Sequence, residues 1–143
     1  MCIRDRHDAA ESCQFVFSTD RVKFACMTDL GAVTPHVIEK VTGADALLIE
    51  SNYDPEMLRL GPYPPSLQAR IQGAWGHLAN EQAGEVLETL DHSNLQHVLL
   101  GHLSERNNTD ETARATVTGY MSGDTDRVSV LQQHACSPWI TLE

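Results

Sequence analysis

The chain has 143 residues, of which 41% are hydrophobic and 21% are charged, a balance typical of one folded soluble domain. Its net charge of −10 argues against a generally basic surface for nucleic acid, so action on phosphodiesters would rely on metal ions or on basic residues outside this chain. The sequence shows neither a membrane-length apolar run nor the apolar core of a signal peptide, so we expect a cytoplasmic protein with no membrane partner.

The first third of the chain predicts a hairpin, a helix and a buried strand. Residues 14–18 and 22–28 are apolar, β-branched or aromatic and are separated by a short polar turn, which is typical of a β-hairpin. Thr34, followed by a proline, is a suitable N-cap for a helix over residues 34–41. The continuous apolar run 45–51 predicts a strand that is covered on both faces.

The middle of the chain predicts a long loop, a helix and a second buried strand. Four prolines interrupt residues 52–71, which favours a loop with short helical turns over a single helix. Residues 80–90 place apolar side chains on one face at helical spacing. The run 97–100 is short and wholly apolar, as expected of another buried strand.

The last third predicts one more helix and two closing strands. Asn108, followed three residues later by Glu111, resembles a capping box that opens a helix. Residues 127–133 and 139–143 have the composition of strands. The predicted order is therefore β-β-α-β-(loop)-α-β-α-β, and strands that alternate with helices indicate a layered α/β architecture.

Several polar residues stand where predicted strands end. Asp29 follows the second strand, Glu50 ends the third, and His102 ends the next buried strand. Ligands collect outside the carboxyl ends of strands in open α/β sheets, so these residues form a candidate site. His7, which precedes the hairpin, and His77, just ahead of a predicted helix, are added to it.

Each of these residues also has a simpler explanation when it is taken singly. An aspartate after a strand is commonly a turn former or a helix cap, and a histidine there is commonly a hydrogen-bonded surface residue. Glu50 could pair with a surface arginine. The matched positions of Asp29 and His102 favour a shared site, but spacing alone leaves its ligand open.

Four longer motifs resemble the YycJ/WalJ-type branch of the metallo-β-lactamase superfamily, and they occur in the order of that family. They are TDLG (28–31), LLIESNYDPEMLRLGPYPPSLQARI (47–71), GHLANEQA (76–83) and LLGHLSERNNT (99–109). The resemblance runs from about His7 to the C-terminal end. It implies a bacterial metal-dependent hydrolase of the kind assigned a role as a DNA exonuclease. The implied fold is a four-layer αββα sandwich made of two similar halves.

The resemblance also implies a role for each candidate residue. Asp29 is similar to the carboxylate that bridges two metal ions, His102 to the last histidine ligand, and His7 to the histidine that completes the first metal's shell. Glu50 and His77 resemble an acid–imidazole pair that assists proton transfer in related phosphodiesterases. Two zinc, manganese or iron ions in the full-length protein would suit such ligands and could clamp a phosphoryl displacement.

Three polar residues that follow Gly101 and His102 in the last of these motifs could orient substrate or support the metal ligands. They are Ser104, Asn107 and Asn108. Their alternative role, as formers of a loop and a helix cap, is the favoured one.

One signature of the family, His-x-His-x-Asp-His, is absent from the sequence. It normally lies upstream of the motifs above and supplies four metal ligands. We therefore expect residues 7–143 to be a partial domain, the C-terminal half of the sandwich, from a truncated gene model. Residues 1–6 resemble nothing in the family and are expected to be a non-native start from adapter read-through. The alternative is a genuine short protein that lost its first half.

The expected function is that of a fragment of a dinuclear metal-dependent hydrolase, a phosphodiesterase or DNA exonuclease whose full-length form acts on nucleic acid. Three candidate ligands cannot fill the shells of two ions, so the chain alone is expected to be inactive. It is also expected to aggregate through an uncovered sheet face. The alternatives are an RNA-processing nuclease, a small-molecule lactonase or thioesterase of the same fold, and a non-catalytic α/β module that docks to a partner. The sequence gives no oligomeric state.

Overall fold

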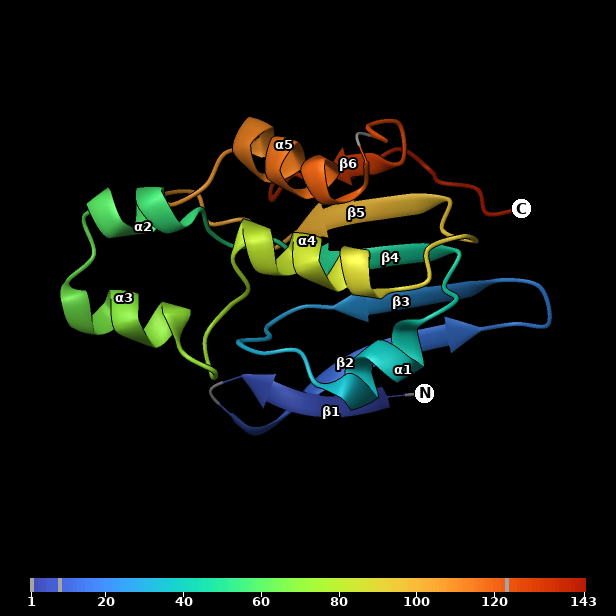
Figure 1. Ribbon diagram of the computed structural model, residues 1–143, viewed down its shortest axis with the longest axis horizontal. Coiled ribbons are helices and arrows are strands. Elements are labelled where there is room, and N and C mark those ends of the chain that lie inside the picture. Colours follow the sequence, from blue (N-terminus) through green and yellow to red (C-terminus); the bar gives the residue numbers. More distant parts are fainter. Residues whose placement is uncertain (1, 8, 123) are drawn as a thin grey trace.

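The computed structural model describes residues 2–7, 9–122 and 124–143, with side chains described from residue 13 onward. Within these ranges one sheet has six strands, ordered in space as they are along the chain (Figure 1). The strands are β1 (Cys2–His7), β2 (Ala9–Ser18), β3 (Lys23–Met27), β4 (Ala46–Glu50), β5 (His97–Gly101) and β6 (Val128–Val130). The first three strands pair antiparallel, and β3 to β6 run parallel to one another.

Helices connect the parallel strands. The described helices are α1 (Pro35–Val41), α2 (Pro55–Leu60), α3 (Pro65–Gln72), α4 (Asn80–Thr89) and α5 (Asp110–Tyr120). Right-handed crossovers between successive neighbouring strands place their helices on one face of the sheet, and α1, α4 and α5 lie on the same face (Figure 1). The short helices α2 and α3 lie beyond the carboxyl ends of the parallel strands (Figure 1). No helix of the described ranges is long and apolar enough to cross a bilayer.

The main core fills the space between these helices and one face of the sheet. Alternate residues of the central strands point into it and are fully buried, because neighbouring side chains of a strand face opposite sides. These strand residues are Ala25, Met27, Leu47, Ile49, Val98 and Leu100. The predicted apolar face of α4 is confirmed, since Ala83, Val86, Leu87 and Leu90 belong to this core.

The opposite face of the sheet has no covering helix among the described residues (Figure 1). Phe15 is 43% exposed and Phe17 is 57% exposed. Phe17 stacks on both Phe15 and Phe24, with ring centroids 6.2 and 6.1 Å apart. The prediction that residues 45–51 are covered on both faces is therefore wrong at Leu48, which stays partly exposed. An apolar face uncovered by helices is what the resemblance implied for this half of the sandwich.

The local predictions in the first two thirds of the chain are largely confirmed. The hairpin is present as β2 and β3, and Thr34 caps α1 by accepting a hydrogen bond from the Val37 amide. The proline-rich stretch 52–71 forms two short helices rather than one long one. Strand β1 was not predicted, because its sequence CIRDRH carries alternating charges instead of an apolar pattern.

Two predictions near the C-terminal end are wrong. The N-cap of α5 is Thr109, whose hydroxyl accepts from the Thr112 amide, and Asn108 instead turns its side chain into the protein. Residues 139–143 join no hydrogen-bond ladder of the described sheet, and the backbone amide and carbonyl of Glu143 bond instead to the side chain of Gln96. The predicted strand 127–133 is reduced to the three residues of β6.

Candidate metal centre

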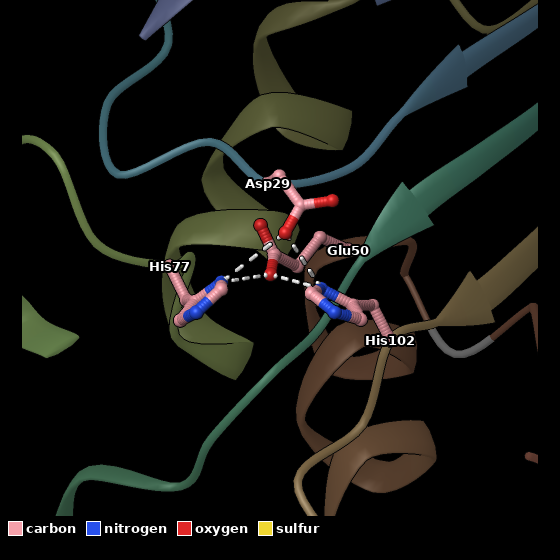
Figure 2. Close-up of side chains that lie close together, drawn as sticks. All are labelled: Asp29, Glu50, His77 and His102. Carbon is pink, nitrogen blue, oxygen red and sulfur yellow. Dashed lines mark hydrogen bonds and ion pairs between the residues drawn. The ribbon is translucent and has the colours of Figure 1, made fainter. Parts of the chain in front are cut away.

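Four titratable side chains converge at the carboxyl ends of the central strands (Figure 2). Asp29 follows β3, Glu50 ends β4 and His102 follows β5, while His77 comes from the segment ahead of α4. One potential ligand atom from each lies within 4.8 Å of all the others. Because β3, β4 and β5 are parallel neighbours, their carboxyl ends share one edge of the sheet, and the predicted convergence of these residues is confirmed.

Asp29 and His102 leave their strands through an unusual backbone conformation. Their φ angles are 59° and 58°, in the left-handed region that residues other than glycine rarely adopt. Ser122 is the one other such residue that the structure describes. The conformation costs roughly 1–2 kcal/mol per residue, and strain of this kind clusters at functional sites. Both residues with this strained backbone thus lie in the same cluster of titratable side chains.

Glu50 lies at the centre of the cluster and is fully buried. Its Oε1 is 2.7 Å from Nδ1 of His77 and 2.7 Å from Nδ1 of His102, and its Oε2 accepts a hydrogen bond from the Leu30 amide at 2.9 Å. A carboxylate can only accept, so both rings carry a proton on Nδ1 and donate it to Glu50. Nε2 of His102 is left for another partner.

These hydrogen bonds shift the pKa values of Glu50 and His102. Burial alone would raise the pKa of Glu50, but the hydrogen bonds from His102 and His77 outweigh burial, and the pKa of this carboxyl lies below its ordinary value. The hydrogen bond to Glu50 raises the pKa of His102 above its ordinary value, against a smaller opposing effect of burial, and Asp29 adds to the rise. Glu50 therefore stays ionised deep in the protein.

Asp29 and His102 are the members of the cluster that face outward. Their side chains are 43% and 42% exposed, and Asp29 Oδ1 lies 3.6 Å from His102 Nδ1 and 4.0 Å from His77 Nδ1. A carboxylate beside imidazoles suits zinc, manganese or iron, so the donor set fits a divalent metal ion. Glu50 has its oxygens engaged by three donors and suits the role of an orienting partner for the ligands.

A buried amide network lies directly behind the cluster. The Ser51 hydroxyl donates to Asn80 Oδ1 at 2.6 Å, Asn80 Nδ2 donates to Asn108 Oδ1 at 3.0 Å, and Asn108 Nδ2 donates to the Ser51 carbonyl at 2.8 Å. These contacts join the end of β4 to the starts of α4 and α5. The sequence did not predict the roles of Ser51 and Asn80, and an asparagine at the first position of α4 was the only local signal.

The remaining predicted site residues lie at the margin of the cluster. His7 ends β1, and its side chain lies outside the described residues, so its place in a metal shell stays a prediction. Ser104 accepts hydrogen bonds from the backbone and side-chain amides of Asn107 at 3.3 and 3.2 Å. Asn107 and Asn108 are buried. These contacts fit the loop-forming role that was favoured from the sequence, and a substrate role for the three residues stays a prediction.

A groove with a volume of about 1200 Å³ opens in front of the cluster. His77 and His102 line it, together with residues of α3, of the loop after β5 and of the segment after β6. His102, a candidate metal ligand, and His77 are therefore accessible from this groove.

Comparison with known proteins gives both sequence and structural relatives. Residues 2–103 match the profile of the β-lactamase superfamily domain. The exodeoxyribonuclease YycJ of Bacillus anthracis is 40% identical over 112 residues, which make up 78% of this chain and 42% of that protein. The exodeoxyribonuclease WalJ of Streptococcus pneumoniae serotype 2 is 36% identical over 116 residues, which make up 81% and 43% of the two chains. The chain thus spans less than half the length of these relatives.

Solved structures share the fold at low sequence identity. The metallo-β-lactamase fold protein YhfI of Bacillus subtilis has a TM-score of 0.66 and 16% identity, over 92% of this chain and 46% of that chain. Zn²⁺-bound PqqB of Methylobacterium extorquens has a TM-score of 0.57 and 17% identity, over 91% and 43% of the two chains. These likenesses concern the path of the backbone, which here matches somewhat less than half of each neighbour.

Proposed function

Because this chain belongs to the metallo-β-lactamase superfamily, we propose that it provides part of a metal-dependent hydrolase site that cleaves phosphodiester bonds, with DNA as the substrate. The observation that carries the proposal is the convergence of four metal-ligating side chains at one sheet edge, where Asp29 and His102 lie beside the hydrogen-bonded pair of Glu50 and His77. The names of both relatives, which are exodeoxyribonucleases, support DNA over other phosphodiesters.

Asp29 and His102 are the proposed metal ligands. Asp29 has two carboxylate oxygens and can contact two ions, while His102 is left with Nε2 for a metal because its Nδ1 proton is donated to Glu50. Bound divalent ions would supply an activated water and polarise a phosphoryl oxygen. Zinc, manganese and iron all suit these ligands, and an aspartate–histidine set does not select among them.

His77 is the proposed proton donor to the leaving oxygen. Its Nδ1 proton is held by Glu50 at 2.7 Å, which fixes the orientation of the ring. In its protonated form the ring carries a second proton on Nε2, which it can donate to the leaving oxygen. Glu50 therefore acts on the reaction by positioning His77, because both of its own oxygens already accept hydrogen bonds.

We also infer that the chain by itself turns over DNA slowly or not at all. A catalytic zinc ion commonly takes three protein ligands and one water, and two such shells need more ligands than Asp29, His102 and the predicted His7 provide. The chain is expected to bind at most one ion weakly.

Metal binding by the purified chain tests the ligand assignment. We expect isothermal titration with Mn²⁺ or Zn²⁺ to show at most one ion per chain, and Asp29→Asn to weaken this binding by at least about tenfold. Asparagine tolerates the left-handed backbone of position 29, so the variant should keep its fold. The control is His36→Ala, an exposed histidine of α1. Undiminished binding by Asp29→Asn would show that Asp29 is not a ligand.

Hydrolysis can be measured on a chimera that joins this chain to the part of the Bacillus anthracis relative outside the matched region. Linear DNA, RNA of the same sequence and a lactone are compared as substrates. We expect metal-dependent cleavage of DNA that Asp29→Asn abolishes. Preference for RNA or for the lactone would replace the proposed substrate, and a folded, metal-loaded chimera that cleaves none of the three would contradict a hydrolase.

A further inference from the structure

The groove in front of the metal centre has one mostly apolar wall. Tyr63, Leu67, Ile71 and Trp75, which lie in and beside α3, line this side, together with Arg70 of the same helix. Helix α3 buries none of its residues, and Trp75 keeps 47% of its surface exposed although it lines a groove. This wall therefore offers aromatic and aliphatic surface to whatever occupies the groove.

The rest of the lining is mixed, and its polar part, here called the polar wall, comes from the loop after β5 and the segment after β6. Ser104, Arg106 and Thr109 of the loop after β5 line it, with glutamines of the segment after β6. Arg106 is exposed and forms no ion pair or hydrogen bond within the ranges that the structure describes. Its guanidinium is thus available to an anion in the groove.

The acidic residues of the polar wall are engaged locally. Glu105 lies 3.1 Å from Nε2 of His134, and Asp110 accepts a hydrogen bond from the side chain of Gln132. Each of these partners also lines the groove. Both carboxylates are thus engaged by neighbouring side chains, in a wall that also carries Arg106.

The dimensions of the groove favour a polymer over a small molecule. Its volume of about 1200 Å³ exceeds the roughly 300–1,000 Å³ of ordinary small-molecule pockets. Both His77 and His102 line it, so an occupant that fills it reaches these two histidines of the cluster.

We propose that this groove binds single-stranded DNA, with Trp75 stacking on a base and Arg106 contacting a backbone phosphate. This proposal rests on the proposed function, because it takes DNA as the substrate. It adds that the DNA is single-stranded and that it binds in this groove. A single strand has the same two-sided chemistry as the groove, because its base faces are apolar and its phosphates are anionic. Stacking on aromatic side chains together with cationic contacts is the usual way in which proteins hold such strands.

The overall charge of the chain restricts how many phosphates are contacted. With a net charge of −10 and ten lysines and arginines in total, the chain lacks a basic face that could track a long backbone. Binding must therefore be local and only weakly dependent on salt. Each phosphate contact contributes a slope of about −0.7 to the dependence of log affinity on log salt for single strands.

The fluorescence of Trp75 provides a direct test. The chain has two tryptophans, and Trp139 is fully exposed and lies outside the groove. In a Trp139→Phe background Trp75 is the sole tryptophan reporter. We expect oligo(dT) of about ten nucleotides to quench its fluorescence in a saturable manner. The titration is done with EDTA present, so that its outcome is independent of metal binding.

Substitutions separate the two contacts. Trp75→Ala should weaken binding of a dye-labelled oligonucleotide, followed by anisotropy, by at least about fivefold. Arg106→Gln should weaken binding and make the salt slope shallower by about 0.7. The matched control is Arg21→Gln, an exposed arginine in the turn between β2 and β3, at the end of the sheet away from the groove. Circular dichroism verifies the fold of each variant.

Three results would overturn the proposal. They are an absence of saturable quenching, unchanged affinity of Trp75→Ala, and tighter binding of duplex than of single-stranded DNA. Since metal is excluded, any of these would leave the metal-binding test of the proposed function standing. Conversely, loss of metal binding has no bearing on quenching measured in EDTA.

Discussion

Glu50 arranges two histidines around one oxygen atom. Both Nδ1 atoms lie 2.7 Å from Oε1, so the carboxylate orients the two rings in the same way. The surroundings of the rings differ. His102 is 42% exposed and is the nearer to Asp29, whereas His77 is 20% exposed and lies 4.0 Å from Asp29. This difference supports the assignment of His102 as a metal ligand and of His77 as a proton donor.

A pair of alanine substitutions distinguishes these two roles. We expect His102→Ala to weaken Mn²⁺ or Zn²⁺ binding by more than about tenfold, because a metal ligand is lost. We expect His77→Ala to leave metal binding within about threefold, because His77 is not assigned as a ligand and Glu50 still orients His102. Isothermal titration on the purified variants measures both. Equal losses in the two variants would make His77 a ligand as well.

At the scale of elements, the network of Ser51, Asn80 and Asn108 holds the site edge together. It joins the end of β4, which carries Glu50, to the starts of α4 and α5, two of the helices that cover the sheet. All three residues are buried, so their hydrogen bonds have no competing water. Buried polar networks of this kind are costly to break, because each orphaned group keeps its desolvation penalty.

Removing one member of the network should therefore destabilise the fold. Asn108→Ala leaves the Asn80 side chain and the Ser51 carbonyl without this partner, and we expect the free energy of unfolding to fall by about 1–3 kcal/mol. Urea denaturation followed by circular dichroism measures the change. Asn94→Ala, at an exposed turn position, is the control and should stay within about 0.5 kcal/mol. A similar small change in Asn108→Ala would mean that the network does not support the edge.

Elements with local signals were predictable, and those that depend on distant neighbours were not. The N-cap of α1 and the apolar face of α4 lie in contiguous sequence. At the start of α5 both Asn108 and Thr109 are good caps, and the contact of Asn108 with Asn80, 28 residues away, decides between them. Strand composition at 139–143 cannot show whether the backbone of this segment pairs with a strand or with a side chain, as Glu143 does with Gln96.

The site was predictable to the same extent. Parallel strands imply that Asp29, Glu50 and His102 meet, whereas their roles came from family resemblance and stay predictions. The shared use of Glu50 Oε1 by two rings depends on side-chain placement across three elements. No spacing along the chain carries that information.

At the scale of the whole molecule, helices cover one face of the sheet and leave the other apolar. Phe15, Phe17 and Phe24 form a stacked row there, and the first two are each about half exposed. Contiguous exposed aromatic surface favours association, because burying a phenylalanine contributes about 1.5–3 kcal/mol. The chain is therefore expected to self-associate through this face.

Replacing the two exposed phenylalanines tests the role of this face. We expect Phe15→Thr combined with Phe17→Thr to raise the concentration at which the chain self-associates by about tenfold or more, since threonine keeps the strand propensity while removing the aromatic surface. Sedimentation velocity over a concentration series measures this. Leu60→Thr, which removes a 69% exposed leucine of α2, is the control. Association that persists unchanged in the double variant would place the contact elsewhere.

The sheet adds its strands in space in the order in which they occur along the chain. During synthesis on the ribosome, each new strand can therefore pair with a neighbour that has already been synthesised, and no strand has to insert between two earlier ones. Residue 29 is synthesised first among the four clustered side chains and residue 102 last. The cluster thus reaches completion during translation only when the fifth strand joins the growing edge.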